Sequence, residues 1–210
     1  MKLPYSYIAI EGVIGVGKTT LATLLSETYQ TKLVLEQFED NPFLPKFYKR
    51  PEQYAFPLEL SFLVERFQQL SKHLITPDLS FSSVISDYLT EKSLIFSEKT
   101  LPEDLFTLYR QLFYIIFKTL PKPDLLVYLL AEPEKLKANI VRRGRDYEQA
   151  IRLDYLQQLQ SGYWEFIHNL TDQRTLVIDV NNLDFAHNPS HYATICDLIS
   201  QTYPIGVHQR

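Results

Sequence analysis

A glycine-rich stretch near the start of the chain, GVIGVGKT over residues 12–19, most constrains what this sequence can fold into. It has the form G-x-x-x-x-G-K-[ST], and both of its flanks suit a phosphate-binding loop, or P-loop. The apolar run Tyr7–Glu11 predicts a buried strand before the loop. Apolar residues recur every three or four positions in Lys18–Tyr29, which predicts a helix after it.

Each part of such a loop has a role in holding a nucleoside triphosphate. Backbone N–H groups turn toward phosphate oxygens, and the helix N-terminus adds partial positive charge. Lys18 is expected to reach the β- and γ-phosphates, and the Thr19 hydroxyl is expected to bind Mg²⁺. The predicted phosphate contacts are Gly12, Gly15, Val16, Gly17, Lys18, Thr19 and Thr20.

Strand and helix patterns alternate along the rest of the chain. Further strands are predicted at Leu33–Glu36, Val84–Ser86, Leu125–Leu130 and Leu176–Val180. Further helices are predicted at Ala55–Leu74, Leu105–Leu120, Glu134–Arg143, Ile151–Leu170 and Tyr192–Thr202. This alternation predicts a single α/β domain over residues 1–210, with a parallel sheet flanked by helices on both faces.

Composition excludes several classes of function. The net charge of -4 argues against a nucleic-acid-binding protein. No apolar run approaches the roughly 20 residues of a membrane span, and the chain enters its first strand without a signal-like segment. The single cysteine, Cys196, cannot form an intrachain disulfide and is expected to pack as a small apolar residue. We therefore expect a cytoplasmic protein without membrane partners.

Two acidic residues follow predicted strands. Glu36 is a candidate base that takes a proton from a substrate hydroxyl, although a solvated strand-end acid would look the same. Asp87 is a candidate Mg²⁺ ligand, directly or through water, with a helix N-cap as the alternative. Ligands of parallel sheets bind beyond the carboxyl ends of the strands, so both acids and the P-loop are expected to meet in one cleft.

Arginines and aromatic residues form two further clusters. The segment Arg142-Arg143-Gly144-Arg145 suits a mobile lid, at about residues 142–149, that clamps the transferring phosphoryl group. The alternative is a solvated basic helix end. A second cluster has helical spacing and predicts core or a subunit interface; it comprises Phe113, Tyr114 and Phe117.

Five motifs occur in order between Ile8 and about Phe185: IAIEGVIGVGKTTLA, EDNPFLPKFYKRPEQYAFPLELSFLVER, VISDY, RRGRDYEQ and LVIDVNNLDF. In these motifs the chain resembles the deoxyribonucleoside kinases, especially the bacterial deoxyguanosine and deoxyadenosine kinases. The resemblance implies transfer of the γ-phosphoryl group of ATP to the 5′-hydroxyl of a purine deoxyribonucleoside, with Mg²⁺, in deoxynucleotide salvage. It also implies a homodimer formed through helices, for which Leu105–Leu120 is a candidate.

The resemblance extends to single residues. It implies that Glu36 activates the 5′-hydroxyl, and that Tyr48 and Glu148 bind the 3′-hydroxyl. It places Arg66 in the base pocket. The implied lid arginines are Arg143 and Arg145, which would stabilise transferred charge together with Lys18.

Among the residues expected near the phosphate donor, some match the family and others differ from it. Asp87 matches the acid of an acidic-Arg-Ser motif, but Tyr88 and Leu89 follow it where the family usually has Arg and Ser. Lys92 is a candidate replacement for the missing positive charge. Asn139 stands where relatives often have an arginine, for which Arg142 is a candidate substitute among the phosphate contacts. Residues 179–185 resemble the loop that meets the adenine of the donor.

Glu59 lies seven residues before Arg66, at a position where many relatives have glutamine. A carboxylate offers only acceptors, and guanine presents N1–H and N2–H₂ as adjacent donors. Adenine N1 would instead face an anion, and an unpaired buried polar group costs about 1–3 kcal/mol. We therefore predict deoxyguanosine as the first substrate and deoxyinosine as the second. The alternative is that Glu59 points elsewhere or forms a salt bridge with Arg66 and does not contact the base.

Two other functions fit a P-loop protein. A nucleoside monophosphate kinase of the thymidylate type would need cations for the substrate phosphate, where Glu36 and Glu39 would repel it. A non-catalytic nucleotide-binding subunit is the other possibility, but the chain has no N-K-x-D-type guanine signature.

Overall fold

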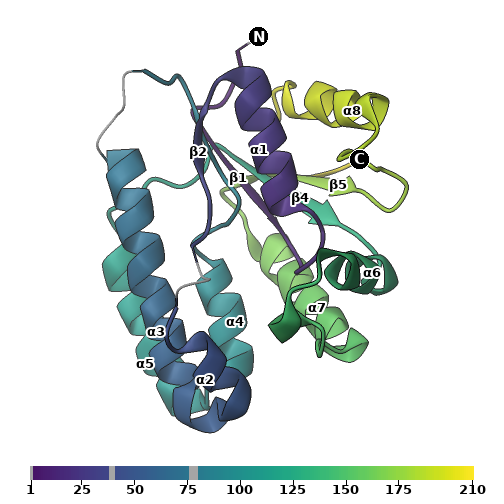
Figure 1. Ribbon diagram of the computed structural model, residues 1–210. Helices are drawn as coiled ribbons and strands as arrows, with labels where there is room; N and C mark the ends of the chain where they lie inside the picture. Colours follow the sequence, from purple (N-terminus) through teal and green to yellow (C-terminus); the bar gives the residue numbers. More distant parts are fainter. Residues whose placement is uncertain (1, 38–40, 76–79) are drawn as a thin grey trace. The chain divides into compact units, whose positions relative to one another are not determined.

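A computed structural model describes residues 2–37, 41–75 and 80–210 of the chain, which Figure 1 draws as a ribbon. The chain divides into two compact units. The first comprises Met1–Leu35, Leu79–Leu89 and Lys122–Arg210, and the second comprises Glu36–Asp78 and Thr90–Pro121. The expectation of a single domain over residues 1–210 stays a prediction.

One parallel sheet organises the first unit. In the described part of the chain it has six strands: β1 (Tyr7–Gly12), β2 (Lys32–Val34), β3 (Val84–Ser86), β4 (Leu125–Leu130), β5 (Arg174–Asp179) and β6 (Gly206–Gln209). Their order is β2-β3-β1-β4-β5-β6, and every pairing is parallel. The central strands β1 and β4 are buried almost throughout, as continuous apolar runs predict.

Helices flank this sheet, which confirms the predicted α/β class. They are α1 (Lys18–Tyr29), α6 (Pro133–Arg143), α7 (Leu153–Asn169) and α8 (Pro189–Ile199), with a short 3₁₀ turn, η2 (Asp146–Glu148). Helices α1 and α8 lie side by side (Figure 1). A hydrogen bond of 2.9 Å joins the Tyr29 hydroxyl at the end of α1 to Ser200 Oγ directly after α8. Helix α7 packs Tyr163 against Tyr128 of β4, with ring centroids 5.6 Å apart.

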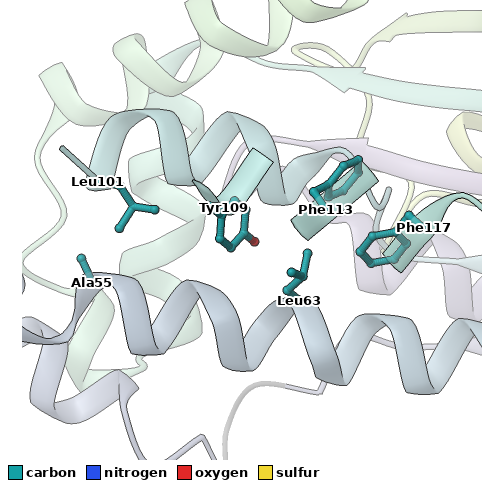
Figure 2. Packing of buried hydrophobic residues seen from close by; sticks show 6 residues of the cluster. All are labelled: Ala55, Leu63, Leu101, Tyr109, Phe113 and Phe117. Atoms are coloured by element: carbon teal, nitrogen blue, oxygen red, sulfur yellow. The ribbon is translucent and has the colours of Figure 1, made fainter. Parts of the chain in front are cut away.

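The second unit is helical. It contains α2 (Leu44–Lys49), α3 (Pro51–Leu70), the π-helical turn η1 (Ser71–Ile75), α4 (Lys92–Thr100) and α5 (Glu103–Phe117). Figure 2 shows the apolar faces of α3 and α5 packed together. The buried side chains there are Ala55, Leu63, Leu101, Tyr109, Phe113 and Phe117. This assigns Phe113 and Phe117 to the core, whereas Tyr114 between them is 61% exposed.

The structure corrects several predicted boundaries. The second strand ends at Val34, so Glu36 follows it and does not belong to it. The helix predicted from Ala55 already begins at Pro51, a residue suited to the first helical turn, and changes to π-helix after Leu70. Among the α-helices and strands of the described residues, α2, α4 and β6 were not predicted. None of the helices in the described part of the chain has the length and apolar character needed to cross a bilayer.

Candidate active site

The P-loop connects β1 to α1 in a conformation that needs glycine. Gly15 and Gly17 have φ angles of +89° and +104°, in the left-handed region. A Cβ atom on Gly15 would lie 2.6 Å from the carbonyl oxygen of Leu136. A Cβ atom on Gly17 would lie 2.8 Å from the ring of Phe185, so the 179–185 segment packs directly against the loop.

The side chain of Lys18 lies over this loop. Its Nζ donates a hydrogen bond to the carbonyl oxygen of Gly12 at 2.7 Å and lies 3.9 Å from Glu11 Oε1. On the other side, the Asn139 amide donates to the carbonyl oxygen of Gly15 at 2.9 Å. Asn139, which stands where relatives often have arginine, thus helps to hold the loop.

Glu11 is a structural centre of the site that the sequence analysis missed. Its carboxylate is almost fully buried; Oε1 accepts from the Gly12 N–H at 2.9 Å and from the Tyr163 hydroxyl at 3.1 Å. Its Oε2 accepts from the Leu89 N–H at 3.0 Å. One carboxylate therefore links β1, α7 and the segment after β3. The available signal was a charged residue in an apolar strand directly before the first loop glycine.

The two predicted Mg²⁺ ligands meet. Thr19 Oγ1 donates to Asp87 Oδ2 at 2.5 Å. A hydroxyl and a carboxylate oxygen suit Mg²⁺, which typically uses one or two carboxylates together with phosphate oxygens and water. The described residues contain no group of three or more His, Cys, Asp or Glu side chains that could hold a metal ion. Tyr88, in place of the family's usual arginine, is fully buried.

Two of the three arginines in the predicted lid meet at Glu148. Helix α6 ends at Arg143 because Gly144 adopts a left-handed φ of +75°. Arg143 Nη2 is hydrogen-bonded to Glu148 Oε2, and Arg145 Nη1 lies 3.5 Å from Glu148 Oε1. Arg142 donates instead to Asn139 Oδ1 at 3.2 Å. Glu148 therefore binds the lid arginines.

Tyr48, which the resemblance pairs with Glu148 at the 3′-hydroxyl, belongs to α2. Its side chain lies outside the described part of the chain, so the pairing stays a prediction.

In the second unit, Glu36 is half-buried and lies at the centre of a charge cluster whose two cations, Arg66 and Lys92, are buried. Arg66 donates to Glu36 Oε1 from Nε at 2.9 Å and from Nη2 at 2.6 Å. Lys92 Nζ donates to Oε2 at 2.6 Å. Burial alone would raise the pKa of Glu36, but the charges of Lys92 and Arg66 hold this pKa far below its ordinary value. Glu36 is therefore an anion at neutral pH, and Lys92 is its direct partner.

Glu59 is buried, and its surroundings differ from those of Glu36. Thr100 Oγ1 donates to Glu59 Oε1 at 3.1 Å, and the Tyr109 hydroxyl donates to the Glu59 backbone carbonyl at 3.2 Å. Burial raises the pKa of Glu59 to about 7, although the charge of Arg66 opposes this shift. The described hydrogen bonds of Arg66 go to Glu36 and Ser93, so Arg66 and Glu59 form no ion pair.

The chain has clear counterparts among known proteins. The model of the deoxynucleoside kinase family matches residues 8–203. The chain belongs to this family. It is similar to the deoxyguanosine kinase of Bacillus subtilis, with 38% identity over 90% of this chain and 93% of that protein. It is also similar to the deoxyguanosine kinase of Lactobacillus johnsonii, with 32% identity over 85% of this chain and 84% of that protein.

Solved structures show the same fold. A deoxyadenosine kinase from M. mycoides with dCMP and a flexible dCDP bound has a TM-score of 0.78 and 25% identity, over 92% of this chain and 98% of that one. The same kinase with dATP bound has a TM-score of 0.79 at 23% identity, over 93% of this chain and 100% of that one. Family membership confirms a nucleoside-phosphorylating enzyme and disfavours both the monophosphate kinase and the non-catalytic subunit.

Proposed function

We propose that this enzyme transfers the γ-phosphoryl group of ATP to the 5′-hydroxyl of deoxyguanosine, with deoxyinosine as its second substrate. The observation that carries this preference is Glu59, a buried carboxylate on the same helix as Arg66. In its ionised form it offers two acceptors to the N1–H and N2–H₂ donors of guanine. The similarity to the deoxyguanosine kinases of Bacillus subtilis and Lactobacillus johnsonii supports the same choice of base.

We assign the chemistry to the charged residues that the sequence analysis named. Glu36 is ionised at neutral pH and takes the proton of the 5′-hydroxyl as this oxygen attacks the γ-phosphorus. Lys18, Arg143 and Arg145 stabilise the negative charge of the transferring group. Tyr48 and Glu148 hold the sugar. Thr19 and Asp87 would hold Mg²⁺, which would neutralise phosphate charge.

The Glu59→Gln variant tests the base assignment. Glutamine has one donor and one acceptor, so one donor of guanine would lose its partner at a cost of about 1–3 kcal/mol. We expect kcat/KM for deoxyguanosine relative to deoxyadenosine to fall by about 10- to 100-fold. Steady-state assays of both nucleosides with ATP and Mg²⁺ measure this ratio.

Glu52→Gln is the matched control, because Glu52 lies on the same helix and is exposed. It should leave the ratio unchanged. An unchanged substrate ranking in Glu59→Gln would show that Glu59 does not contact the base.

The Asp87→Asn variant tests the metal assignment. Loss of one carboxylate charge from a site with so few protein ligands should raise the Mg²⁺ concentration for half-maximal activity by about tenfold, or roughly 1.4 kcal/mol. Titration with Mg²⁺ at constant free ATP measures this concentration. Asp172→Asn is the control, because Asp172 is exposed. Asp124 is less suitable because it accepts a hydrogen bond from the backbone of β1. A wild-type titration curve for Asp87→Asn would contradict the assignment.

We also propose a cytoplasmic homodimer. Helix α5 packs one face into the core and exposes Leu108, Tyr114 and Ile115, at 46%, 61% and 72% of their surface. Exposed apolar side chains of this size favour a protein interface. The single Cys196 supports a reducing compartment. Sedimentation equilibrium of the native protein tests the dimer.

A further inference from the structure

We propose that Glu59 reads the base in both of its protonation states, so that the preference for deoxyguanosine over deoxyadenosine increases with pH. This inference rests on the proposed function, in which Glu59 contacts the base. It adds that the same side chain serves both deoxyguanosine and deoxyadenosine, and that the pH sets the ratio of the two activities.

The contrast between two glutamates of the second unit, Glu36 and Glu59, supports this inference. Glu36 accepts three N–H hydrogen bonds from Arg66 and Lys92, which fix it as an anion. Glu59 accepts only one hydrogen bond at its carboxylate among the described residues, from the neutral hydroxyl of Thr100. Its Oε2 atom accepts no hydrogen bond from the described residues. Glu59 therefore lacks the partners that would hold it in one charge state.

Thr100 can accommodate either state of Glu59. Its single hydroxyl hydrogen has two acceptors at 3.1 Å, Glu59 Oε1 and the carbonyl oxygen of Phe96. With Glu59 ionised, the hydroxyl donates to the carboxylate. With Glu59 protonated on Oε2, Oε1 remains a carbonyl acceptor for the Thr100 hydroxyl, and the O–H of Glu59 stays available to a bound base. Neither state leaves Thr100 without a hydrogen bond.

Glu59 has charged and titratable neighbours on several elements. The charged neighbours are Arg66 on α3, Lys92 on α4 and Glu36, which precedes α2 in the chain, and the titratable neighbour on α5 is Tyr109. Burial raises the pKa of Glu59 to about 7; Arg66, Thr100 and Lys92 oppose the shift and Glu36 adds to it. Because this pKa is raised, Glu59 is mainly protonated below neutral pH and mainly ionised above it.

Each protonation state matches one purine. The ionised carboxylate has acceptors only and complements the N1–H and N2–H₂ donors of guanine. The protonated carboxyl group has one O–H donor and one carbonyl acceptor, and it complements the N1 acceptor and N6–H₂ donor of adenine. The proton comes from solvent when deoxyadenosine binds the ionised enzyme, and it returns to solvent when deoxyguanosine binds the protonated enzyme.

A quantitative expectation follows from this pairing. If deoxyguanosine uses the ionised enzyme and deoxyadenosine the protonated enzyme, the ratio of their kcat/KM values follows the ratio of the two forms. That ratio changes about tenfold per pH unit on both sides of the pKa. The preference for deoxyguanosine should therefore rise by about 100-fold between pH 6 and pH 8.

The experiment measures kcat/KM for both nucleosides from pH 6 to pH 8, with ATP and Mg²⁺ saturating and ionic strength constant. The ratio cancels every pH effect that the two reactions share, including effects on Glu36 and on ATP. The wild-type enzyme should give a slope of about one in a plot of log ratio against pH, and Glu59→Gln a slope near zero. Thr100→Val should keep the slope but favour deoxyadenosine more at each pH, because removing this hydrogen bond raises the pKa of Glu59 further.

Calorimetry of the wild-type enzyme provides a measurement that depends on no variant. In two buffers with different ionisation enthalpies, deoxyadenosine binding at pH 8 should take up about one proton, and deoxyguanosine binding at pH 6 should release about one. A wild-type ratio that does not change with pH would overturn the two-state inference and leave the deoxyguanosine preference intact. A Glu59→Gln ratio equal to the wild-type ratio at every pH would overturn the base assignment itself.

Discussion

Glu36→Gln is expected to lower kcat for nucleoside phosphorylation by about 10²- to 10⁴-fold. Glutamine keeps the shape of the side chain but cannot accept the proton of the 5′-hydroxyl. The substrate oxygen must then attack the γ-phosphorus while still protonated, or pass its proton to water. Single-turnover assays at saturating nucleoside and ATP measure the chemical step separately from product release.

The control for this variant must separate chemistry from folding. Glu36→Gln leaves the buried side chains of Arg66 and Lys92 without their anion, and removal of one partner from a buried ion pair costs about 3–5 kcal/mol. Urea unfolding and ATP binding should therefore be measured on the same preparation. Glu98→Gln, on an exposed position of α4, is the matched substitution and should keep wild-type turnover. A folded Glu36→Gln enzyme with full turnover would exclude Glu36 as the base.

The pH dependence of the two glutamates has opposite signs. The pKa of Glu36 is lowered by folding, so its contribution to stability is complete above its ordinary value near 4.5 and is lost only as the pH falls through the lowered folded pKa. The pKa of Glu59 is raised, so its ionisation in the folded protein costs stability as the pH rises above the ordinary value. Glu36 therefore does not titrate between pH 6 and pH 8, and Glu59 does.

Local patterns were sufficient to predict the phosphate-binding part of the fold. The strand β1, the glycine loop and the helix α1 are contiguous, so motif and periodicity define them together; α1 begins and ends as predicted. The adjacency of Thr19 and Asp87 followed from the rule that parallel strands end at one edge of a sheet.

Pairings between distant residues could not be predicted in the same way. Lys92 contacts Glu36 across 56 positions, and Tyr163 contacts Glu11 across 152 positions, so neither contact leaves a periodic signal. The prolines around α2 also concealed a short helix, because Pro45 falls in its first turn, where a missing N–H group costs little. Contacts between residues far apart in the sequence thus determine the surroundings of Glu36 and Glu11.

Gly15→Ala is expected to lower the free energy of unfolding by about 2–5 kcal/mol and to abolish most ATP binding. Alanine is strained at the φ of +89° that this position adopts. Its Cβ would also lie 2.6 Å from the backbone carbonyl oxygen of Leu136 and 2.9 Å from the side chain of Ile140. The loop and α6 would have to separate, and this would displace the backbone N–H groups of the loop that are expected to bind phosphate. Urea unfolding and ATP titration measure the two effects.

Gly144→Ala separates backbone strain from steric conflict. Gly144 also has a left-handed φ, +75°, but a Cβ atom there would meet nothing within 4 Å. This variant should therefore lose only about 1–2 kcal/mol, the cost of an alanine in that conformation. The difference between the two variants measures the contact between the P-loop and α6. Equal losses of unfolding free energy would mean that α6 can move away from the loop at no energetic cost. Backbone strain alone would then account for the requirement for glycine at position 15.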